Sequence, residues 1–414
     1  MMNNISIALI SGKGGSGKTT LSLGMASLLS ECGIKVLLVD CDLSTNGATY
    51  FYEKRLNNER ISYTSFSDSL MSDQSVENHN LMSIDQYYFF MPSTTRIPDE
   101  DSLPFTHSEL EESHFIDYYN KLKETYEAII FDCQAGYTDI LTFLLPLVDK
   151  ALVVMEADAV SSAAVRSLYL KIGNLIKNKV SYQVFNKTTK EENDIYSKVS
   201  DGTLFTNLGC INFDWKVRKA FSILATPNIN NTSVEYGQQL YELSNIMFDN
   251  NSMLERLEQY SLQLDIRQTK DKEEELTGQL VKIQEKNSHK DERSFSERMV
   301  RYLTSLDSSI LLGLVGVVIA VLSLSVLSIY EKPNTFTQLV LIVFVLASTI
   351  LSFSTTLREL KRKKADRTEL TAKKEYVLTQ QLSELAEQRK KLEAKYAKIQ
   401  DDFGLNDGDA EKDT

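Results

Sequence analysis

A glycine-rich loop between an apolar run and a helical stretch constrains the fold of this chain more than any other feature. Residues 11–20 read Ser-Gly-Lys-Gly-Gly-Ser-Gly-Lys-Thr-Thr, and the apolar run 5–10 precedes them directly. Glycines let the backbone turn so tightly that successive N–H groups converge on phosphate oxygens. The helix that follows adds the positive end of its dipole at the same point. The loop therefore predicts a phosphate-binding site between a strand and a helix.

The side chains of the loop suit a nucleotide with a bound metal ion. Lys18 would supply positive charge at the β- and γ-phosphates, and the Thr19 hydroxyl would ligate Mg²⁺. The backbone of the loop would make the remaining phosphate contacts. The predicted nucleotide-binding residues of the loop are Gly14, Gly15, Ser16, Gly17, Lys18, Thr19 and Thr20.

Residues 1–250 alternate short apolar runs with helical stretches, which is the pattern of a parallel α/β sheet. Most of the runs are continuously apolar, as expected for strands that are buried on both faces. The predicted strands are 5–10, 36–40, 87–91, 128–132, 151–155 and 182–185. We therefore predict the α/β fold class, with a mostly parallel sheet.

Lys13 stands ahead of the glycines in the pattern KGGxGKT, which resembles the signature of the ParA/MinD group of ATPases. The resemblance covers about residues 1–250 and implies a P-loop NTPase of the SIMIBI type. In that family the signature lysine crosses a dimer interface to the partner's nucleotide, so that ATP binding and sandwich dimerisation are one event. For this chain the resemblance implies a homodimer, ATP and Mg²⁺ as cofactors, and slow ATP hydrolysis.

Two acidic strand ends resemble further motifs of the family. In the first, residues 36–42, Asp40 would lie near the magnesium ion and Asp42 near the attacking water. The second, residues 128–136, resembles Walker B and switch II, in which Asp132 reaches the magnesium through its water shell. Carboxylates at strand ends that face a phosphate site suit metal and water positioning. Without the preceding loop, such an Asp pair would more often be a turn or a helix cap.

Gly136 and Asn186 complete the site that the resemblance implies. The backbone N–H of Gly136 would approach the γ-phosphate, where a side chain would clash. Many families have a proline in this segment, whereas this chain has Cys-Gln-Ala, which leaves the motion of switch II open. Asn186 resembles the adenine-reading asparagine, because an amide offers one donor and one acceptor; the alternative is a turn residue. The implied catalytic residues are Lys13, Lys18 and Asp42, and the implied metal ligands are Thr19, Asp40 and Asp132.

Two uncharged stretches, 308–330 and 335–357, predict a transmembrane hairpin. Each is long enough to span the ~30 Å hydrocarbon core at ~1.5 Å per residue. The alternative is a buried hairpin in a soluble domain, but nothing nearby could cover two helices that are apolar all round. Basic residues gather on both flanks, while the turn has only Lys332, so the positive-inside rule places both flanks in the cytoplasm. We therefore expect a bacterial inner-membrane protein whose ATPase domain and coiled coil are cytoplasmic.

Charged helical stretches, 252–307 and 358–401, flank the predicted spans. Apolar residues in the second follow alternating steps of four and three, which is typical of a coiled coil. A solvated single helix is the alternative for either stretch. Their similar lengths allow antiparallel pairing as a stalk of roughly 65–75 Å. Residues 402–414 form an acidic tail that we expect to be disordered.

Charge and cysteine content argue against other classes of protein. A formal net charge of −12 disfavours a protein that coats nucleic acid, so we expect no nucleic-acid partner. The small basic cluster at 216–219 is interpreted as a solvated helix face. The four cysteines are scattered without a CxxC pair, which fits a reducing compartment and offers no metal-site spacing.

Three functional hypotheses follow. The favoured one is a membrane-tethered ATPase switch, in which ATP closes a dimer and the stalk couples that state to the membrane or to a protein partner. The second is a membrane effector in stress or phage defence, whose hairpin damages or remodels the bilayer after nucleotide-triggered assembly. The third is a bacterial tyrosine kinase of the polysaccharide-regulating type. Those kinases place the membrane part first, lack the signature lysine and end in a tyrosine cluster, whereas the last thirty residues here hold only Tyr396.

Overall fold

The structure is a computed structural model that describes residues 4–58, 63–70, 80–94, 112–177, 179–196, 205–288, 362, 365–366 and 369–399. Contacts divide the chain into two units. The first comprises Met1–Gln268 with Leu392–Thr414, and the second is Thr269–Lys391. The first unit contains the glycine loop and is the one that positions the candidate site.

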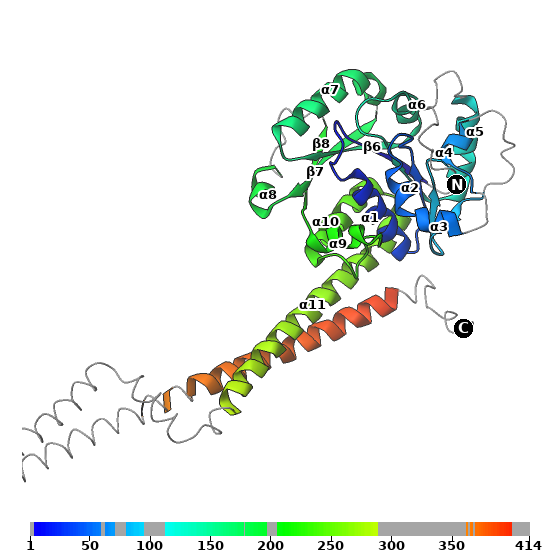
Figure 1. Cartoon of the computed structure of the whole chain (residues 1–414). Coiled ribbons are helices and arrows are strands. Elements are labelled where there is room, and N and C mark those ends of the chain that lie inside the picture. The colour runs from blue at the N-terminus through cyan, green and yellow to red at the C-terminus, as the bar shows by residue number, and fades with distance from the viewer. Residues whose placement is uncertain are drawn as a thin grey trace, which may run out of the picture. The chain divides into compact units, whose positions relative to one another are not determined.

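An eight-stranded sheet lies at the centre of the first unit, in the order β3-β4-β2-β5-β1-β6-β7-β8 (Figure 1). β3 pairs with β4 antiparallel, and the other neighbouring pairs are parallel. The predicted α/β class with a mostly parallel sheet is thus confirmed. The strands are β1 (Ile5–Ile10), β2 (Val36–Asp40), β3 (Met82–Ser83), β4 (Tyr88–Met91), β5 (Ala128–Asp132), β6 (Lys150–Glu156), β7 (Val180–Thr188) and β8 (Thr206–Asn212).

The strands that match the sequence prediction best are the most deeply buried ones. β1, β2 and β5 begin and end at the predicted residues, and every residue in them is buried. β8 was not predicted, because most of its residues are only half-buried and no continuous apolar run marks it. Gly209, at φ +95°, and register shifts against β7 interrupt it further. The two-residue β3 was also missed, because it is too short to show a period.

Helices cover both faces of the sheet (Figure 1). Successive strand residues point to opposite faces, so Ile7 and Leu9 pack with α1, α10 and the start of α11, while Ala8 and Ile10 pack with α5, α6 and α7. The helices are α1 (Lys18–Glu31), α2 (Gly47–Phe51), α3 (Glu53–Asn58), α4 (Phe66–Ser69), α5 (Glu112–Thr125), α6 (Asp139–Leu147), α7 (Ala159–Ile176), α8 (Lys190–Tyr196), α9 (Trp215–Ser222), α10 (Val234–Met247) and α11 (Asn251–Ser288).

The core of the first unit continues into α11. Leu257 and Tyr260 are buried in the same apolar cluster as α1 and α10. Arg256 donates to the carbonyl oxygen of Gly33 at 2.9 Å and forms an ion pair with Glu127. The first turns of α11 are therefore part of the sheet domain, beyond the boundary near residue 250 that the composition suggests.

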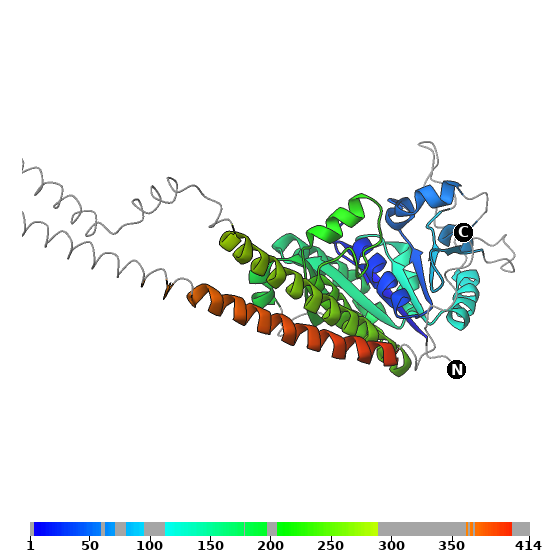
Figure 2. The same cartoon turned by 90° about the horizontal axis from the view of Figure 1, so that it is seen from below.

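Residues 369–399 are helical and contact α11 in both units. In the first unit, Lys395 forms an ion pair with Glu258 at 2.8 Å. In the second, Arg389 pairs with Glu273 at 3.3 Å. Figure 2 shows the C-terminal end of the helix at 369–399 beside the first turns of α11. Residue numbers fall along one helix as they rise along the other, so the two helices run antiparallel. The coiled-coil stalk itself stays a prediction.

The predicted spans 308–330 and 335–357 lie outside the described residues, as does the tail 402–414. Among the helices that the structure does describe, none is both long enough and apolar enough to cross a membrane.

Candidate nucleotide site

The glycine loop follows β1, and α1 begins at its lysine. Lys18 is buried, and its Nζ donates to the Ser11 Oγ at 2.8 Å. That hydroxyl in turn donates to the carbonyl oxygen of Lys13 at 2.8 Å. Gly14 and Gly15 are exposed at the crest of the loop. Lys18 is therefore held at the base of the loop, while the backbone at Gly14 and Gly15 is open to a ligand.

Two residues near the end of β7 hold the glycine loop through its backbone carbonyl groups. Gly17 has φ +91°, and a Cβ at this position would lie 2.2 Å from the Asn186 Nδ2. Asn186 is buried, and its Nδ2 donates to the carbonyl oxygen of Ser16 at 2.8 Å. The next residue, Lys187, donates to the carbonyl oxygen of Gly15. The amide nitrogen predicted to read adenine is thus engaged with the loop.

Lys13 forms ion pairs within its own chain. Its Nζ lies 2.9 Å from Glu156 and 3.2 Å from Asp158, and the side chain is 32% exposed. The hydrogen bond with Glu156 is the main cause that raises the pKa of Lys13. The Asp158 carboxylate also accepts from the backbone and hydroxyl of Ser161, bonds that lower its pKa to about 2. To reach a partner subunit, Lys13 has to leave both carboxylates.

Asp132 ends β5 and has one unpaired oxygen. Its Oδ1 is buried and has no hydrogen-bond partner within the described part of the chain. Burial raises the pKa of Asp132 to about 6, against the opposing effects of the Lys18 charge and of hydrogen bonds with Thr19 and Ser22. Carboxylate and hydroxyl oxygens are ligands that Mg²⁺ accepts. Thr19 and Asp132 therefore fit the predicted metal site.

Asp40 is fully buried, and both of its oxygens have donors. Oδ1 accepts from the Asp42 N–H at 3.0 Å, and Oδ2 accepts from the Thr49 N–H at 2.8 Å and the Thr49 hydroxyl at 2.7 Å. Burial, with the charge of Asp132 as the second cause, raises the pKa of Asp40 to about 7. Asp40 thus ties the end of β2 to α2, and its predicted metal contact stays a prediction.

Asp42 and Gly136 also contact protein groups in this conformation. The Asp42 Oδ1 accepts from the backbone of Ser44 at 3.1 Å and of Thr45 at 2.8 Å, so it caps the turn after β2. Gly136, at φ +81°, donates its N–H to the carbonyl oxygen of Ser11 at 2.8 Å. Their predicted contacts with water and the γ-phosphate would therefore require both loops to rearrange.

Sequence reasoning missed a buried polar network beside Asp40. Ser93, just after β4, donates from its backbone to the Thr49 hydroxyl at 2.8 Å and from its Oγ to the Asn46 Oδ1 at 2.6 Å. Asn46 is buried in a left-handed conformation, at φ +49°. A serine after a strand carries no local signal for such a role. Only the pairing of β4 with β2 brings Ser93 to this position.

Gly12→Ala is expected to destabilise the domain, because a Cβ at residue 12 would lie 2.4 Å from the backbone carbon of Ala164 in α7. Overpacking of this kind typically costs about 1–3 kcal/mol. Gly14→Ala is the matched control, since a Cβ there meets no atom within 4 Å. Urea unfolding without nucleotide measures both; equal midpoints for the two variants would contradict the close approach of loop and helix.

Comparison with known proteins gives a domain match for this part of the chain. Residues 4–184 match the AAA domain family model (AAA_31). The matched segment contains the glycine loop, Asp40 and Asp132, and it ends two residues before Asn186. Together with the loop geometry, it supports a P-loop ATPase domain.

Solved structures of low sequence identity also match part of this chain. The MinC:MinD cell division complex of Aquifex aeolicus is 18% identical, covering 60% of this chain and 97% of that chain with a TM-score of 0.47. MinD complexed with Mg-ADP from Pyrococcus horikoshii is 21% identical, covering 59% and 95% with a TM-score of 0.46. A ParA family ATPase from Chlorobium tepidum is 17% identical, covering 58% and 98% with a TM-score of 0.44. Curated protein sequences gave no match.

Proposed function

We propose that the N-terminal domain is a ParA/MinD-like ATPase that binds ATP with Mg²⁺ and hydrolyses it slowly. The observation that carries this proposal is the unpaired, buried oxygen of Asp132 beside Thr19, next to a glycine loop with Lys18 at its base. A buried carboxylate oxygen that accepts no hydrogen bond is costly unless a cation completes its surroundings. The match of residues 4–184 to an AAA domain supports the same function.

The proposed reaction is transfer of the γ-phosphoryl group to water, in which positioning and charge stabilisation do most of the work. Lys18 would neutralise phosphate charge as it leaves the Ser11 hydroxyl. Thr19 and Asp132 would hold Mg²⁺, which when bound neutralises charge that develops between the β- and γ-phosphates. Asp42 would orient the attacking water once its carboxylate no longer accepts the hydrogen bonds from the backbone of Ser44 and Thr45. The site has no evident strong base, so we propose slow intrinsic turnover and stimulation by a protein partner.

We further propose that two copies of the domain close on ATP as a sandwich. Lys13 supports this, because its ammonium group is held by partly exposed carboxylates rather than buried in the core. On dimerisation it would exchange Glu156 and Asp158 for the phosphates of the partner's nucleotide. Nucleotide state and oligomeric state would then be coupled.

Anchoring in the bacterial inner membrane completes the proposal. The two uncharged stretches 308–330 and 335–357 support it, with the ATPase domain on the cytoplasmic side. α11 precedes the hairpin in the sequence and the helix at 369–399 follows it. Contacts between these two helices support a stalk in which they pair. A fixed anchor removes membrane release from the nucleotide cycle, which favours a stationary switch that signals to the membrane or to a partner.

Fractionation combined with an ATPase assay tests this function. The full chain is expected in the membrane fraction, and deletion of residues 308–357 should move it to the soluble fraction with Mg²⁺-dependent hydrolysis retained. A wild-type chain that stays soluble would contradict the anchor, and a purified chain without turnover would contradict the ATPase. Label transferred from ATP to tyrosine would favour the kinase alternative. Toxicity that depends on 308–357 would favour the effector.

A further inference from the structure

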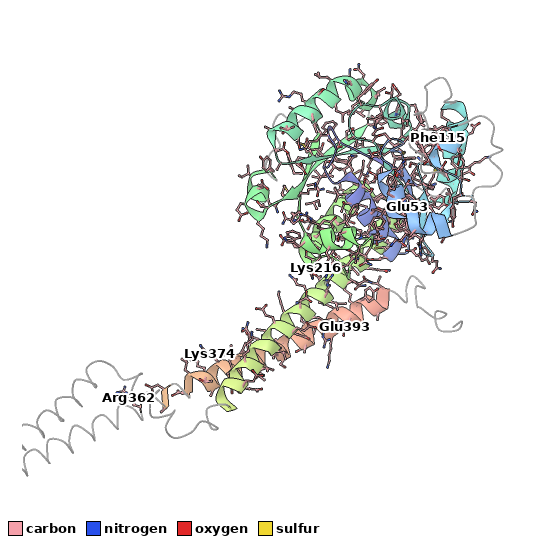
Figure 3. The ribbon with its side chains drawn as sticks, viewed as in Figure 1. Glu53, Phe115, Lys216, Arg362, Lys374 and Glu393 are labelled. Carbon is pink, nitrogen blue, oxygen red and sulfur yellow. The ribbon has the colours of Figure 1, made fainter. Side chains whose placement is uncertain are left out.

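Large apolar side chains and basic side chains are exposed together around α9. Trp215 and Ile223 are 69% and 68% exposed, and Phe213 and Leu224 are 42% and 43% exposed. Figure 3 labels Lys216 on the same helix. We define the α9 patch as Phe213, Trp215, Lys216, Arg218, Lys219, Ile223 and Leu224.

The patch is one continuous face, because α9 buries its opposite side. Val217 and Ala220 are buried against the sheet domain. Trp215 and Lys219 are four residues apart, so they lie above one another on the outer side of the helix, and Ile223 follows as its exposed C-terminal cap. Phe213 contacts the Trp215 ring edge-on at 5.2 Å, and Arg218 lies over that ring at 5.0 Å. The aromatic, aliphatic and basic groups therefore form a single surface.

Core packing does not account for the apolar end of the patch. Leu224 adopts φ +56°, a left-handed conformation that is strained for an L-residue and that glycine would adopt freely. Its side chain is nevertheless half exposed, so burial does not offset that strain. Ile223, the residue before it, is more exposed still. Two large aliphatic side chains are thus presented to the surroundings at a strained turn.

The charge of the patch is strongly positive for an acidic protein. Between residues 212 and 224 the only acidic residue is Asp214, against three basic ones, while the whole chain has a formal net charge of −12. The Asp214 carboxylate caps α9 and accepts from the Ser233 N–H at 2.7 Å. In the residues that the structure describes, no ion pair compensates Lys216, Arg218 or Lys219. The patch therefore suits a partner that is both apolar and anionic.

We propose that the α9 patch docks on an anionic lipid membrane. Tryptophan favours the membrane–water interface, aliphatic side chains insert below it, and basic side chains meet the anionic headgroups. A second copy facing the same patch would bring like charges together. Nucleic acid would leave Ile223 and Leu224 without a role, because contacts to its phosphates are polar. This inference is independent of ATP hydrolysis.

Trp215 is the only tryptophan of the chain, so fluorescence excited at wavelengths that tyrosine does not absorb reports on the patch alone. The full chain is reconstituted in vesicles of phosphatidylcholine, or of phosphatidylcholine and phosphatidylglycerol in equal parts, made with brominated acyl chains. In the anionic vesicles we expect a blue shift and strong quenching of Trp215. In the neutral vesicles the emission should stay close to that in detergent, even though the chain is anchored equally in both.

The variant Lys216→Gln/Arg218→Gln/Lys219→Gln tests the charge while retaining the reporter. A basic side chain near an anionic surface contributes roughly fivefold to association, so the contact should weaken about 100-fold and the quenching should disappear. The matched control is Lys54→Gln/Lys121→Gln/Arg166→Gln, which removes three exposed basic residues from other helices. Leu224→Gly removes the aliphatic tip without strain and should reduce quenching while the fold is retained.

Four outcomes would overturn the proposal. Equal quenching in neutral and anionic vesicles would remove the role of charge, and an unshifted Trp215 in both would remove the contact. A blue shift without lipid that grows with protein concentration would assign the patch to self-association, and a shift on titration with duplex DNA would assign it to nucleic acid. ATP turnover of the triple variant, measured in detergent, should equal that of the wild type. A chain that does not turn over ATP would contradict the proposed ATPase function. The fluorescence measurements would still test the proposed lipid contact.

Discussion

Lys13→Ala is expected to abolish ATP-dependent dimerisation while nucleotide affinity stays close to that of the wild type. In the structure, Lys13 contacts Glu156 and Asp158 rather than the loop residues that would hold phosphate. Its removal should therefore spare the nucleotide site of one subunit. A cation supplied across an interface to a phosphoryl-transfer site contributes about 10³–10⁵-fold to turnover. We therefore expect Lys13→Ala to lower the rate of ATP turnover by at least about 10³-fold, measured with a coupled phosphate assay.

Lys18→Ala is the comparison that separates the two lysines. It removes the charge at the base of the loop, so both nucleotide binding and dimerisation should fail. The assay should use residues 1–268, because the stalk or the spans could hold a constitutive dimer and because Leu257 and Tyr260 of α11 belong to the core. Light scattering with and without ATP measures the mass. A Lys13→Ala domain that dimerises normally would show that the sandwich is wrong for this protein.

The parts of the fold that the sequence predicts are those in which every residue of a short run is buried. β1, β2 and β5 are such runs, and the glycine loop marks where the first of them ends. Parallel strands bring their carboxyl ends to one edge of the sheet, which is why Asp40 and Asp132 were expected together. The register confirms that they are direct neighbours on β2 and β5.

The contacts that the sequence could not predict are between residues far apart in the chain. Lys13 and Glu156 are joined only because β1 pairs with β6. The engagement of Asn186 with the loop, and of Ser93 with Thr49, likewise depends on crossovers that local periodicity does not encode. A resemblance assigns such residues a role in the nucleotide-bound state. It does not reveal which protein groups these residues contact before the ligand binds.

The neighbouring carboxylates of Asp40 and Asp132 make this edge of the sheet costly to maintain. Burial raises the pKa of each, and the charge of Asp132 adds to the rise for Asp40. Structures commonly tolerate such groups where function needs them, and the stability lost is recovered when a cation binds. Asp132 should therefore lower the stability of the metal-free domain and also sustain its ATPase chemistry.

Asp132→Asn is expected to stabilise the metal-free domain at pH 8 and to lower turnover by about 10³-fold, since a metal-held charge supplies several kcal/mol to the transition state. The pKa of Asp132 is about 6 in the folded chain against an ordinary value of 3.8. Below pH 3.8 the Asp132 side chain is protonated in both the folded and the unfolded wild type, so this carboxyl group costs no stability relative to the variant. As the pH rises through 6, the free energy of unfolding of the wild type falls below that of the variant. The difference should reach about 3 kcal/mol at pH 8.

Urea unfolding in EDTA at pH 4, 6 and 8 measures this linkage, with Asp117→Asn as the control because Asp117 is an exposed carboxylate on α5. The control should track the wild type at every pH. The Asp132→Asn curve should separate from it only above pH 4, and saturating Mg²⁺ with a nonhydrolysable ATP analogue should stabilise the wild type more than the variant. A variant that is less stable than the wild type at pH 8 in EDTA would mean that the Asp132 carboxylate is already satisfied by protein groups, and the metal assignment at the end of β5 would then fail.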